Sequence, residues 1–479
     1  MNKGTIIKSL IFKTVERFSV KGLGFIISIL LARMLSPEVF GQIALITVVI
    51  NLSQSIIEGG LGTALVQNKD VDDRDYSTVF YICMAMSVVI ASAVFAGAPL
   101  VARYYKSPEL LLPLRVYIFS VFFSSYASIL TARMQREMRF KQILYCSLTA
   151  TCVSGLLALA LAFAGAGIWT LVVYYFSHTV VNCIAMFTAV RWRPQLHFSV
   201  VRARVLYGFG WKMLVSSLLC SLYYDLRSLI IGKRFSTEAL GYYDRGNQIP
   251  FVISSALDSS VQSVMFPVLA KAQDDKGVLR GILHRSLTLS ALIVIPAMVG
   301  LSAVADTFIR LLLTEKWLPS VVFMEVLCIG HAASALTSPN LVAIKAMGRS
   351  DVYMKLEFVR RVLMLLILAI TVFAFDFVIA MAYSFALSAW IDAIVCAIPS
   401  GLLLGYGVRE QFKAVAKTIL ASVLMGMAVW AVGLLAIPLL LKLVIQIVTG
   451  VIVYIILCRL MKIESFLYIL NYMKQMKKG

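Results

Sequence analysis

Charged side chains are scarce in this chain, and apolar side chains dominate it. Only 14% of the 479 residues are Asp, Glu, Lys or Arg, and 60% are hydrophobic. In an ordinary soluble domain about a quarter of the residues are charged. The composition therefore excludes a water-soluble globular enzyme and indicates a protein that lies mostly within a lipid bilayer.

Motifs of catalysis and metal binding are also missing. No G-x-x-x-x-G-K-[ST] loop is present, so we do not expect the chain to hydrolyse ATP. The four histidines show no H-E-x-x-H spacing, and the eight cysteines form no C-x-x-C pair. We therefore expect no enzyme, no catalytic residues, no metal and no cofactor, and we interpret the cysteines as packing residues. A D-x-D pattern at 70–75 is typical of glycosyltransferases, but its short loop favours a solvated cytoplasmic turn.

Long apolar runs recur along the whole chain. Since about 20 apolar residues are needed to cross a bilayer, fourteen such runs leave no room for a large extramembrane domain. We expect an all-α polytopic membrane protein with about 14 transmembrane helices. The first run has no cleavage site, so we expect it to be retained rather than removed as a signal peptide. The predicted spans are 13–33, 39–60, 77–101, 110–132, 143–164, 168–190, 207–231, 241–268, 284–306, 318–343, 353–374, 377–400, 415–435 and 438–458.

Basic residues are distributed unevenly between the two ends of these spans. One side, which includes both termini, carries 27 Lys and Arg, and the other side carries 8. Because cytoplasmic loops retain Lys and Arg, we expect both termini and the loops at 133–142, 191–206 and 270–283 to face the cytoplasm. This bias explains the formal net charge of +20 without a nucleic-acid partner.

An internal repeat links the two halves of the chain. The segment Leu31-Ala-Arg-Met-Leu-Ser-Pro-Glu-Val-Phe-Gly41 corresponds to Ile231-Gly-Lys-Arg-Phe-Ser-Thr-Glu-Ala-Leu-Gly241, which lies 200 residues later and keeps S-x-E-x-x-G. The acidic pairs at 72–73 and 274–275 repeat in the next connection. Helix capping and close packing could explain each match alone, but together they favour parallel repeats of six helices.

The repeat predicts four parts in the chain. These are an N-terminal six-helix lobe (1–190), a basic cytoplasmic linker (191–206), a C-terminal six-helix lobe (207–400), and two extra transmembrane helices with a basic cytoplasmic tail (401–479). Two lobes can enclose a central cleft, so this is the plan of a transporter.

Basic residues within the first and seventh spans are the main candidates for a binding site. A charge near mid-bilayer costs at least about 2.5 kcal/mol on insertion scales, so such residues usually face an aqueous cavity or a partner. Guanidinium groups match phosphate oxygens and would select an anion such as a pyrophosphate. Snorkelling at the membrane surface, or a local pair of Arg227 with Asp225, are the alternatives. The candidates for this cationic cavity are Lys13, Arg17, Lys21, Lys212 and Arg227.

Other intramembrane charges have weaker interpretations. For Arg115, Arg245, Arg360 and Arg361 we favour interfacial positions. Acidic residues could couple transport to a proton or sodium gradient, although capping at helix ends explains most of them as well. Glu58 and Asp258 are the best of these because they are 200 residues apart and so repeat-equivalent, and Asp225 is a third candidate. The remaining acidic residues in predicted spans are Asp306, Glu325, Glu357, Asp376 and Asp392.

Several motifs together resemble the polysaccharide-exporter branch of the MOP flippase superfamily. The sequence is most similar to Wzx-type flippases of colanic acid or O-antigen repeat units and to teichuronic acid exporters, from about residue 5 to at least 420. The motifs lie at 31–41, 60–69, 133–140, 196–199, 266–275 and 315–317.

The resemblance implies a flippase of the bacterial cytoplasmic (inner) membrane. It would move an undecaprenyl-pyrophosphate-linked oligosaccharide to the outer leaflet by alternating access, for exopolysaccharide or O-antigen assembly. The resemblance also implies a V-shaped, two-lobed fold whose cationic cavity would use Arg17, Lys21 and Arg227. The implied partners are the lipid-linked oligosaccharide, membrane lipids, and the polysaccharide polymerase and glycosyltransferases of the same pathway.

Three other functions remain open at this point. A cation-coupled multidrug exporter of the same superfamily would need acidic cavity residues, whereas the charges here are mainly basic. A membrane polysaccharide polymerase would need a large outer loop, and the longest outward loops, near 102–109, 232–240 and 307–317, have about ten residues each. A scaffold that transports nothing is the third alternative.

Overall fold

The computed structural model describes residues 20–62, 65, 71–272, 275–468 and 470. Throughout these residues the chain forms helices joined by short connections, with no β-strand. The predicted all-α fold class is therefore confirmed. Residue contacts divide the chain into two compact units, Met1–Gly241 and Tyr242–Gly479.

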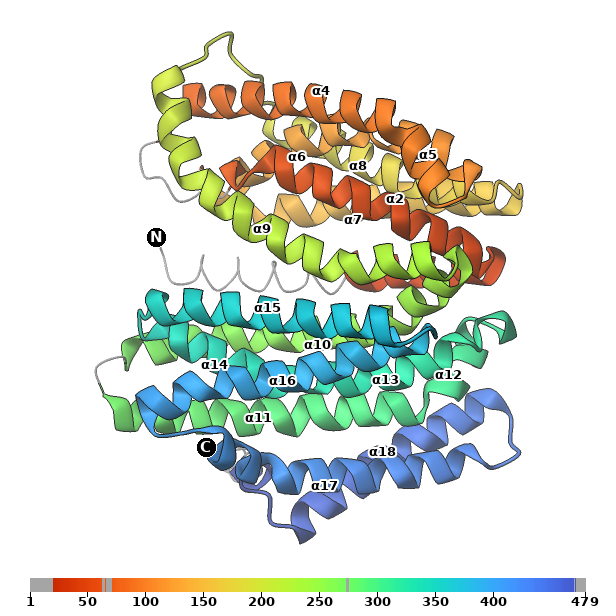
Figure 1. Ribbon diagram of the computed structural model, residues 1–479, viewed down its shortest axis with the longest axis vertical. Helices are drawn as coiled ribbons and strands as arrows, with labels where there is room; N and C mark the ends of the chain where they lie inside the picture. The colour runs from red at the N-terminus through yellow and green to blue at the C-terminus, as the bar shows by residue number, and fades with distance from the viewer. Residues whose placement is uncertain (1–19, 63–64, 66–70, 273–274, 469, 471–479) are drawn as a thin grey trace. The chain divides into compact units, whose positions relative to one another are not determined.

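The first unit contains the helices drawn from red to yellow-green in Figure 1. In this unit α7 packs along α8, and α2 packs against α9. The fourth predicted span is formed by a 3-10 turn followed by two helices. The elements are a helix at 20–34, α2 (Pro37–Glu58), α4 (Asp73–Tyr104), η1 (Pro108–Leu110), α5 (Leu111–Tyr117), α6 (Ser120–Arg136), α7 (Phe140–Phe163), α8 (Ile168–Val190) and α9 (Val200–Arg234).

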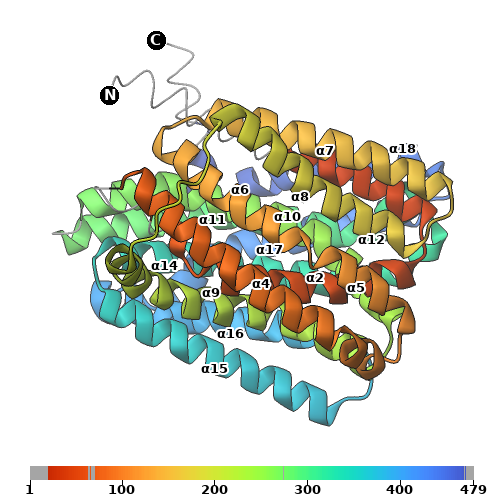
Figure 2. The same ribbon diagram turned by 90° about the horizontal axis from the view of Figure 1, so that it is seen from above.

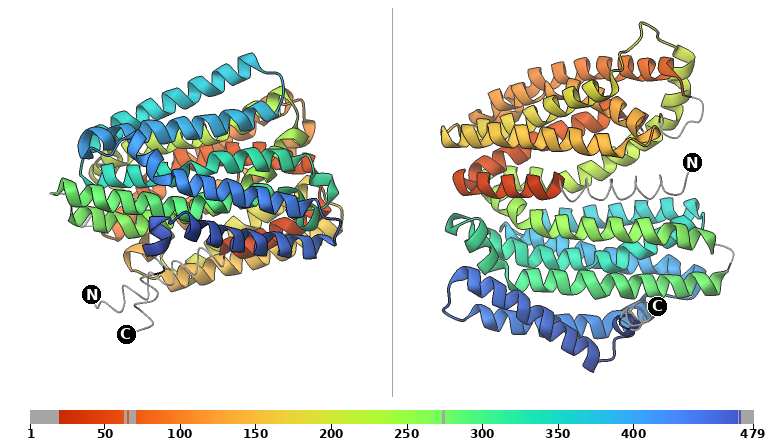
Figure 3. Two further views of the ribbon diagram at one scale, coloured as in Figure 1. Left: turned by 90° about the horizontal axis from the view of Figure 1, so that it is seen from below. Right: turned by 180° about the vertical axis from the view of Figure 1, so that it is seen from behind.

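The second unit begins within α10 (Thr237–Lys271), whose first turn belongs to the first unit. Within it α15 runs beside α16 (Figure 2), and α17 packs against both α11 and α18 (Figure 3). The other elements are α11 (Lys276–Ala303), α12 (Ala305–Leu312), η2 (Glu315–Trp317), α13 (Ser320–Ala332), α14 (Ser334–Ala346), α15 (Ser350–Ala374), α16 (Ile379–Leu404), α17 (Val408–Gly433) and α18 (Leu439–Leu460).

The helices coincide with the predicted spans. Ten helical segments within the described residues are long and apolar enough to cross a membrane. Three of the other predicted spans fall on α9, α10 and α15, and the described part of the span 13–33 falls on the helix at 20–34. Residues 13–19 of that span lie outside the described residues. The count of 14 transmembrane helices is thus compatible with the structure, in which ten segments of the described chain are both long and apolar enough to cross a membrane.

The repeated acidic residues begin equivalent helices of the two halves. The Asp72 carboxylate accepts hydrogen bonds from the backbone N–H groups of Arg74 and Asp75, both at 3.0 Å, at the start of α4. Asp275 does the same at the start of α11, at 2.8 and 3.0 Å. The backbone N–H of Asp75, and after it that of Arg74, holds the pKa of Asp72 below its ordinary value. This part of the repeat is therefore explained by helix capping.

The repeated S-x-E-x-x-G motifs contact each other directly. A Cβ atom on Gly41 would lie 1.6 Å from the carbonyl oxygen of Thr237, and one on Gly241 would lie 2.0 Å from that of Pro37. Any side chain at either glycine would therefore overlap backbone atoms, which cannot rotate away. The first turns of α2 and α10 approach this closely only because both positions lack a side chain.

We predict that Gly41→Ala strongly destabilises the protein. The added methyl group must separate two backbones, at a cost of about 3 kcal/mol or more. Thermal unfolding of the purified protein in detergent measures the effect as a lower melting temperature. Gly97→Ala is the matched control, because nothing lies within 4 Å of a Cβ there. If the Gly41→Ala protein has the same melting temperature as the wild type, the backbone contact is contradicted.

Candidate functional site

The residues predicted to form the cationic cavity are only partly described. Lys13 and Arg17 lie outside the described residues, and so does the side chain of Lys212, whose backbone belongs to α9. Lys21 is exposed on the helix at 20–34. Arg227 on α9 is buried, with 3% of its surface exposed. The cationic cavity itself stays a prediction.

Arg360 is a buried cation with acidic partners. It is 7% exposed, and its guanidinium binds both carboxylate oxygens of Asp392 on α16, with Nη2 lying 2.7 Å from Oδ2. It also bonds Glu357 one turn earlier on α15, which in turn pairs with Arg361 at 3.4 Å. Arg360 is therefore held within the protein by ion pairs, and its interfacial position stays a prediction. Since Glu357 and Asp392 neutralise this guanidinium, their carboxylates have a structural role.

Arg245 is also buried within the protein, and its interfacial position stays a prediction. It is 6% exposed, and its guanidinium lies 5.8 Å from the centre of the Trp317 ring. Trp317 is completely buried in η2 and contacts Tyr242 edge to face. The short motif at 315–317 thus fixes the connection between α12 and α13. Arg115 is partly exposed and stacks 4.6 Å from the ring of Phe95.

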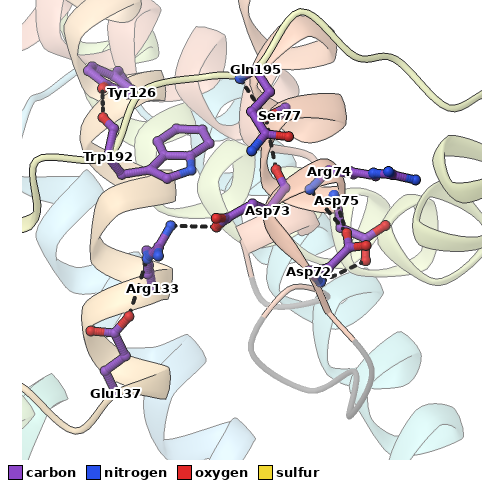
Figure 4. Close-up of polar contacts among 10 residues, drawn as sticks. All are labelled: Asp72, Asp73, Arg74, Asp75, Ser77, Tyr126, Arg133, Glu137, Trp192 and Gln195. Atoms are coloured by element: carbon purple, nitrogen blue, oxygen red, sulfur yellow. Dashed lines mark hydrogen bonds and ion pairs between the residues drawn. The ribbon is translucent and has the colours of Figure 1, made fainter.

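The D-x-D segment has a structural role, as Figure 4 shows. Asp72 and Asp75 form the capping box of α4, and Asp75 is only 1% exposed, so a solvated turn is wrong for it. Asp73 pairs with Arg133 of α6 at 2.7 Å. The backbone N–H of Gln195, in the segment 191–206, donates a hydrogen bond to the hydroxyl oxygen of Ser77 at 2.9 Å. This bond connects the segment to α4. No cluster of three metal ligands occurs among the described residues.

Glu58 and Asp258 have matching surroundings in the two halves. Ser128 of α6 lies beside the Glu58 carboxylate, and Ser334 of α14 lies beside that of Asp258. Glu58 ends α2, where the helix dipole disfavours a negative charge, and Asp258 lies inside α10. The explanation by helix-end capping is therefore wrong for both residues. Asp225, the third candidate, is half-buried on α9.

Glu58 lines a cavity of about 530 Å³ within the first unit. The walls are formed by the end of α2 with the turn after it, α6 and α8. Nine of the thirteen lining residues are polar, and none is Lys or Arg. Apart from Glu58, sequence reasoning missed this site. One signal was present: His178 and Asn182 are four residues apart in a mainly apolar span, so they share one helix face.

We predict that Arg360 and Asp392 stabilise the protein only as a pair. Asp392→Ala should lower the stability by about 3 kcal/mol, because it removes the main partner of a buried guanidinium. The double variant Arg360→Met/Asp392→Leu should recover most of this loss, because well-packed apolar groups replace a buried ion pair at little cost. Thermal unfolding in detergent compares the two. A double variant as unstable as Asp392→Ala would contradict the pairing.

Comparison with known proteins places the chain among polysaccharide biosynthesis proteins. Residues 30–322 match the family described as "Polysaccharide biosynthesis protein". The teichuronic acid biosynthesis protein TuaB of Bacillus subtilis is 26% identical over 396 residues, which cover 80% of this chain and 79% of TuaB. The lipopolysaccharide biosynthesis protein WzxC of Escherichia coli is 24% identical, with coverages of 70% and 68%.

A solved structure shares the fold. The lipid II flippase MurJ in its inward closed conformation has a TM-score of 0.77 to this chain at 14% identity, covering 94% of this chain and 98% of MurJ. The predicted resemblance to the polysaccharide branch of its superfamily is confirmed by the family match and by these relatives, and the solved structure shares the predicted fold. Ten long apolar helical segments, within the described residues, indicate a multi-pass membrane protein. Because the family match covers more than half of the chain, the protein belongs to this family of polysaccharide biosynthesis proteins.

Proposed function

We propose that the protein is a flippase for an undecaprenyl-pyrophosphate-linked oligosaccharide repeat unit. It would move this lipid from the inner to the outer leaflet of the bacterial inner membrane. The observation that carries the proposal is the sequence relationship, over most of the chain, to proteins named for teichuronic acid and lipopolysaccharide biosynthesis. The shared fold with a protein named lipid II flippase supports it. The polysaccharide polymerase and glycosyltransferases of the pathway would be its functional partners.

The pyrophosphate would be held by basic residues of the first and seventh helices. Arg227 supports this proposal because it keeps a cation out of water on α9. A pyrophosphate carries at least two negative charges, and a unit charge pair 4 Å apart interacts by about 4 kcal/mol at an effective dielectric of about 20. We call Arg227 and the other basic residues proposed to hold the pyrophosphate the cationic clamp. These other residues are Lys13, Arg17, Lys21 and Lys212. No covalent step is required, because alternating access only exchanges two conformations.

Glu58 and Asp258 are proposed to carry the coupling proton or sodium ion, with Asp225 as a third acidic residue. Their support is the equivalent acid–serine arrangement in both halves. We also propose that the chain is organised in four parts. These are the lobes at 1–190 and 207–400, the linker 191–206, and the two helices with the basic tail at 401–479.

Multidrug export is the alternative function. A multidrug transporter of the MATE family, in an inward-facing conformation, has the same fold with a TM-score of 0.62. The cavity beside Glu58 holds no basic residue and would tolerate a cationic drug. Loss of fluorescent-dye accumulation in cells that express the protein would favour this alternative.

We predict that both termini and the basic loops face the cytoplasm, following the distribution of Lys and Arg. Glu137→Cys and Phe198→Cys, in a background without other cysteines, should resist a membrane-impermeant maleimide in intact cells. Tyr105→Cys should react. Strong labelling at 137 or 198 with none at 105 would contradict the topology.

We predict that Arg227→Gln and Arg17→Gln each impair polysaccharide export by tenfold or more, with the protein still inserted. Arg227→Lys should give a partial defect, because it keeps the charge and loses the bidentate fork. Export is measured in cells that lack the native gene and is normalised to protein level.

Arg349→Gln is the control for this series, because Arg349 is exposed and pairs only locally with Asp351. It should export normally. Normal export by Arg17→Gln, Lys21→Gln and Arg227→Gln together would contradict the cationic clamp.

A further inference from the structure

The cavity beside Glu58 differs from a phosphate site in its chemistry. It lies within the first unit, and its lining contains one carboxylate, several hydroxyls and amides, one histidine, and neither Lys nor Arg. We propose that this cavity binds the sugar portion of the transported lipid through the hydroxyl groups of the saccharide. The inference rests on the proposed flippase function and adds a second recognition site to the cationic clamp.

The hydroxyl groups of Ser124, Thr131 and Thr179 in the cavity wall already donate their hydrogens to backbone carbonyl groups. Ser124 and Thr131 on α6 donate to backbone carbonyls of their own helix, at 3.1 and 2.7 Å. Thr179 on α8 donates in the same way at 3.0 Å. Since a hydroxyl has a single hydrogen, each of these side chains can offer a ligand only its acceptor lone pairs.

Other groups in the wall are acceptors too. The Glu58 carboxylate accepts hydrogen bonds, and Asn182 Oδ1 is a buried oxygen without a hydrogen-bond partner in the described part of the chain. Thr151 gives its hydrogen to the carbonyl of Ser147 at 2.8 Å, so His178 Nε2, 3.5 Å from the same hydroxyl, must be the donor. Nδ1 of neutral His178 is then an acceptor, with the tautomer assigned from this network.

An excess of acceptors selects a ligand rich in hydrogen-bond donors. Saccharide hydroxyls are such donors, and the amide groups of Gln54, Gln135 and Asn182 can bond the ring and glycosidic oxygens in return. A pyrophosphate offers only acceptors, and the cavity has no Lys or Arg to neutralise its charge, so the cavity disfavours it. Its volume lies within the range of small-molecule sites, about 300–1,000 Å³, and is far larger than one cation needs.

The test measures binding to the full chain in lipid nanodiscs by microscale thermophoresis. Three probes are used: the free oligosaccharide repeat unit released from the surface polysaccharide of the source bacterium, undecaprenyl pyrophosphate without sugar, and sodium chloride. The variants are Asn182→Leu and Thr179→Val, which remove acceptors from the cavity. Asn51→Leu is the matched control, since Asn51 is exposed on α2 and does not line the cavity.

We expect Asn182→Leu and Thr179→Val each to weaken oligosaccharide binding about tenfold. Binding of undecaprenyl pyrophosphate should not change, and Asn51→Leu should match the wild type. Unchanged oligosaccharide binding in both variants, or an equal loss of sugar-free lipid binding, would overturn the proposal. Sodium binding that depends on Asn182, without any sugar binding, would identify a cation site and overturn it as well.

Failure of the flippase function would give a different result. In that case undecaprenyl pyrophosphate would not bind to the wild type and Arg227→Gln would change nothing. Oligosaccharide binding that still depends on Asn182 would then support the sugar site by itself. Conversely, tight binding of the sugar-free lipid that depends on Arg227, without oligosaccharide binding, would keep the flippase and remove the sugar site.

Discussion

The backbone contact between the starts of α2 and α10 constrains the chain more tightly than any other described approach at a glycine. Gly41 and Gly241 face each other's helices without side chains, so peptide groups pack where methyl groups would overlap. Within a bilayer, close backbone packing of this kind replaces the hydrophobic effect, because lipid tails are as apolar as the helices. The two copies of one motif thus supply both surfaces of the contact. This explains why the S-x-E-x-x-G pattern occurs at both positions.

The helices could be predicted from the sequence because the bilayer leaves few alternatives. Backbone groups in lipid must be satisfied within the helix, so apolar runs of sufficient length become spans. The predicted span 168–190 has the bounds of α8, and the last span, 438–458, nearly has those of α18. The repeat could also be found in the sequence, because its residues have defined local roles. Asp72 and Asp275 cap helices, and the glycines allow close backbone contact.

The candidate site could be predicted only in part, because hydropathy gives the cost of a buried charge but not its partner. Arg360 meets Asp392 across 32 residues, and no spacing rule indicates which carboxylate α16 presents to α15. For the same reason no partner could be predicted for Arg245 or Arg360. Glu58 was selected by its repeat position, whereas the hydroxyls around it are ordinary small residues of apolar helices. Their meaning depends on where their single hydrogens go, which only the folded helices determine.

The two proposed sites would divide recognition by chemistry. The cationic clamp would recognise the charge and geometry of the pyrophosphate. Because every lipid carrier of this type has that group, the clamp cannot distinguish one glycan from another. Hydrogen bonds to individual hydroxyls can, because a missing donor leaves a buried acceptor unpaired, which costs more than the bond contributes. A cavity without basic residues also avoids competing with the clamp for the phosphate. Selectivity for the glycan would therefore reside in the walls formed by α2, α6 and α8, and affinity for the lipid carrier in the basic helices.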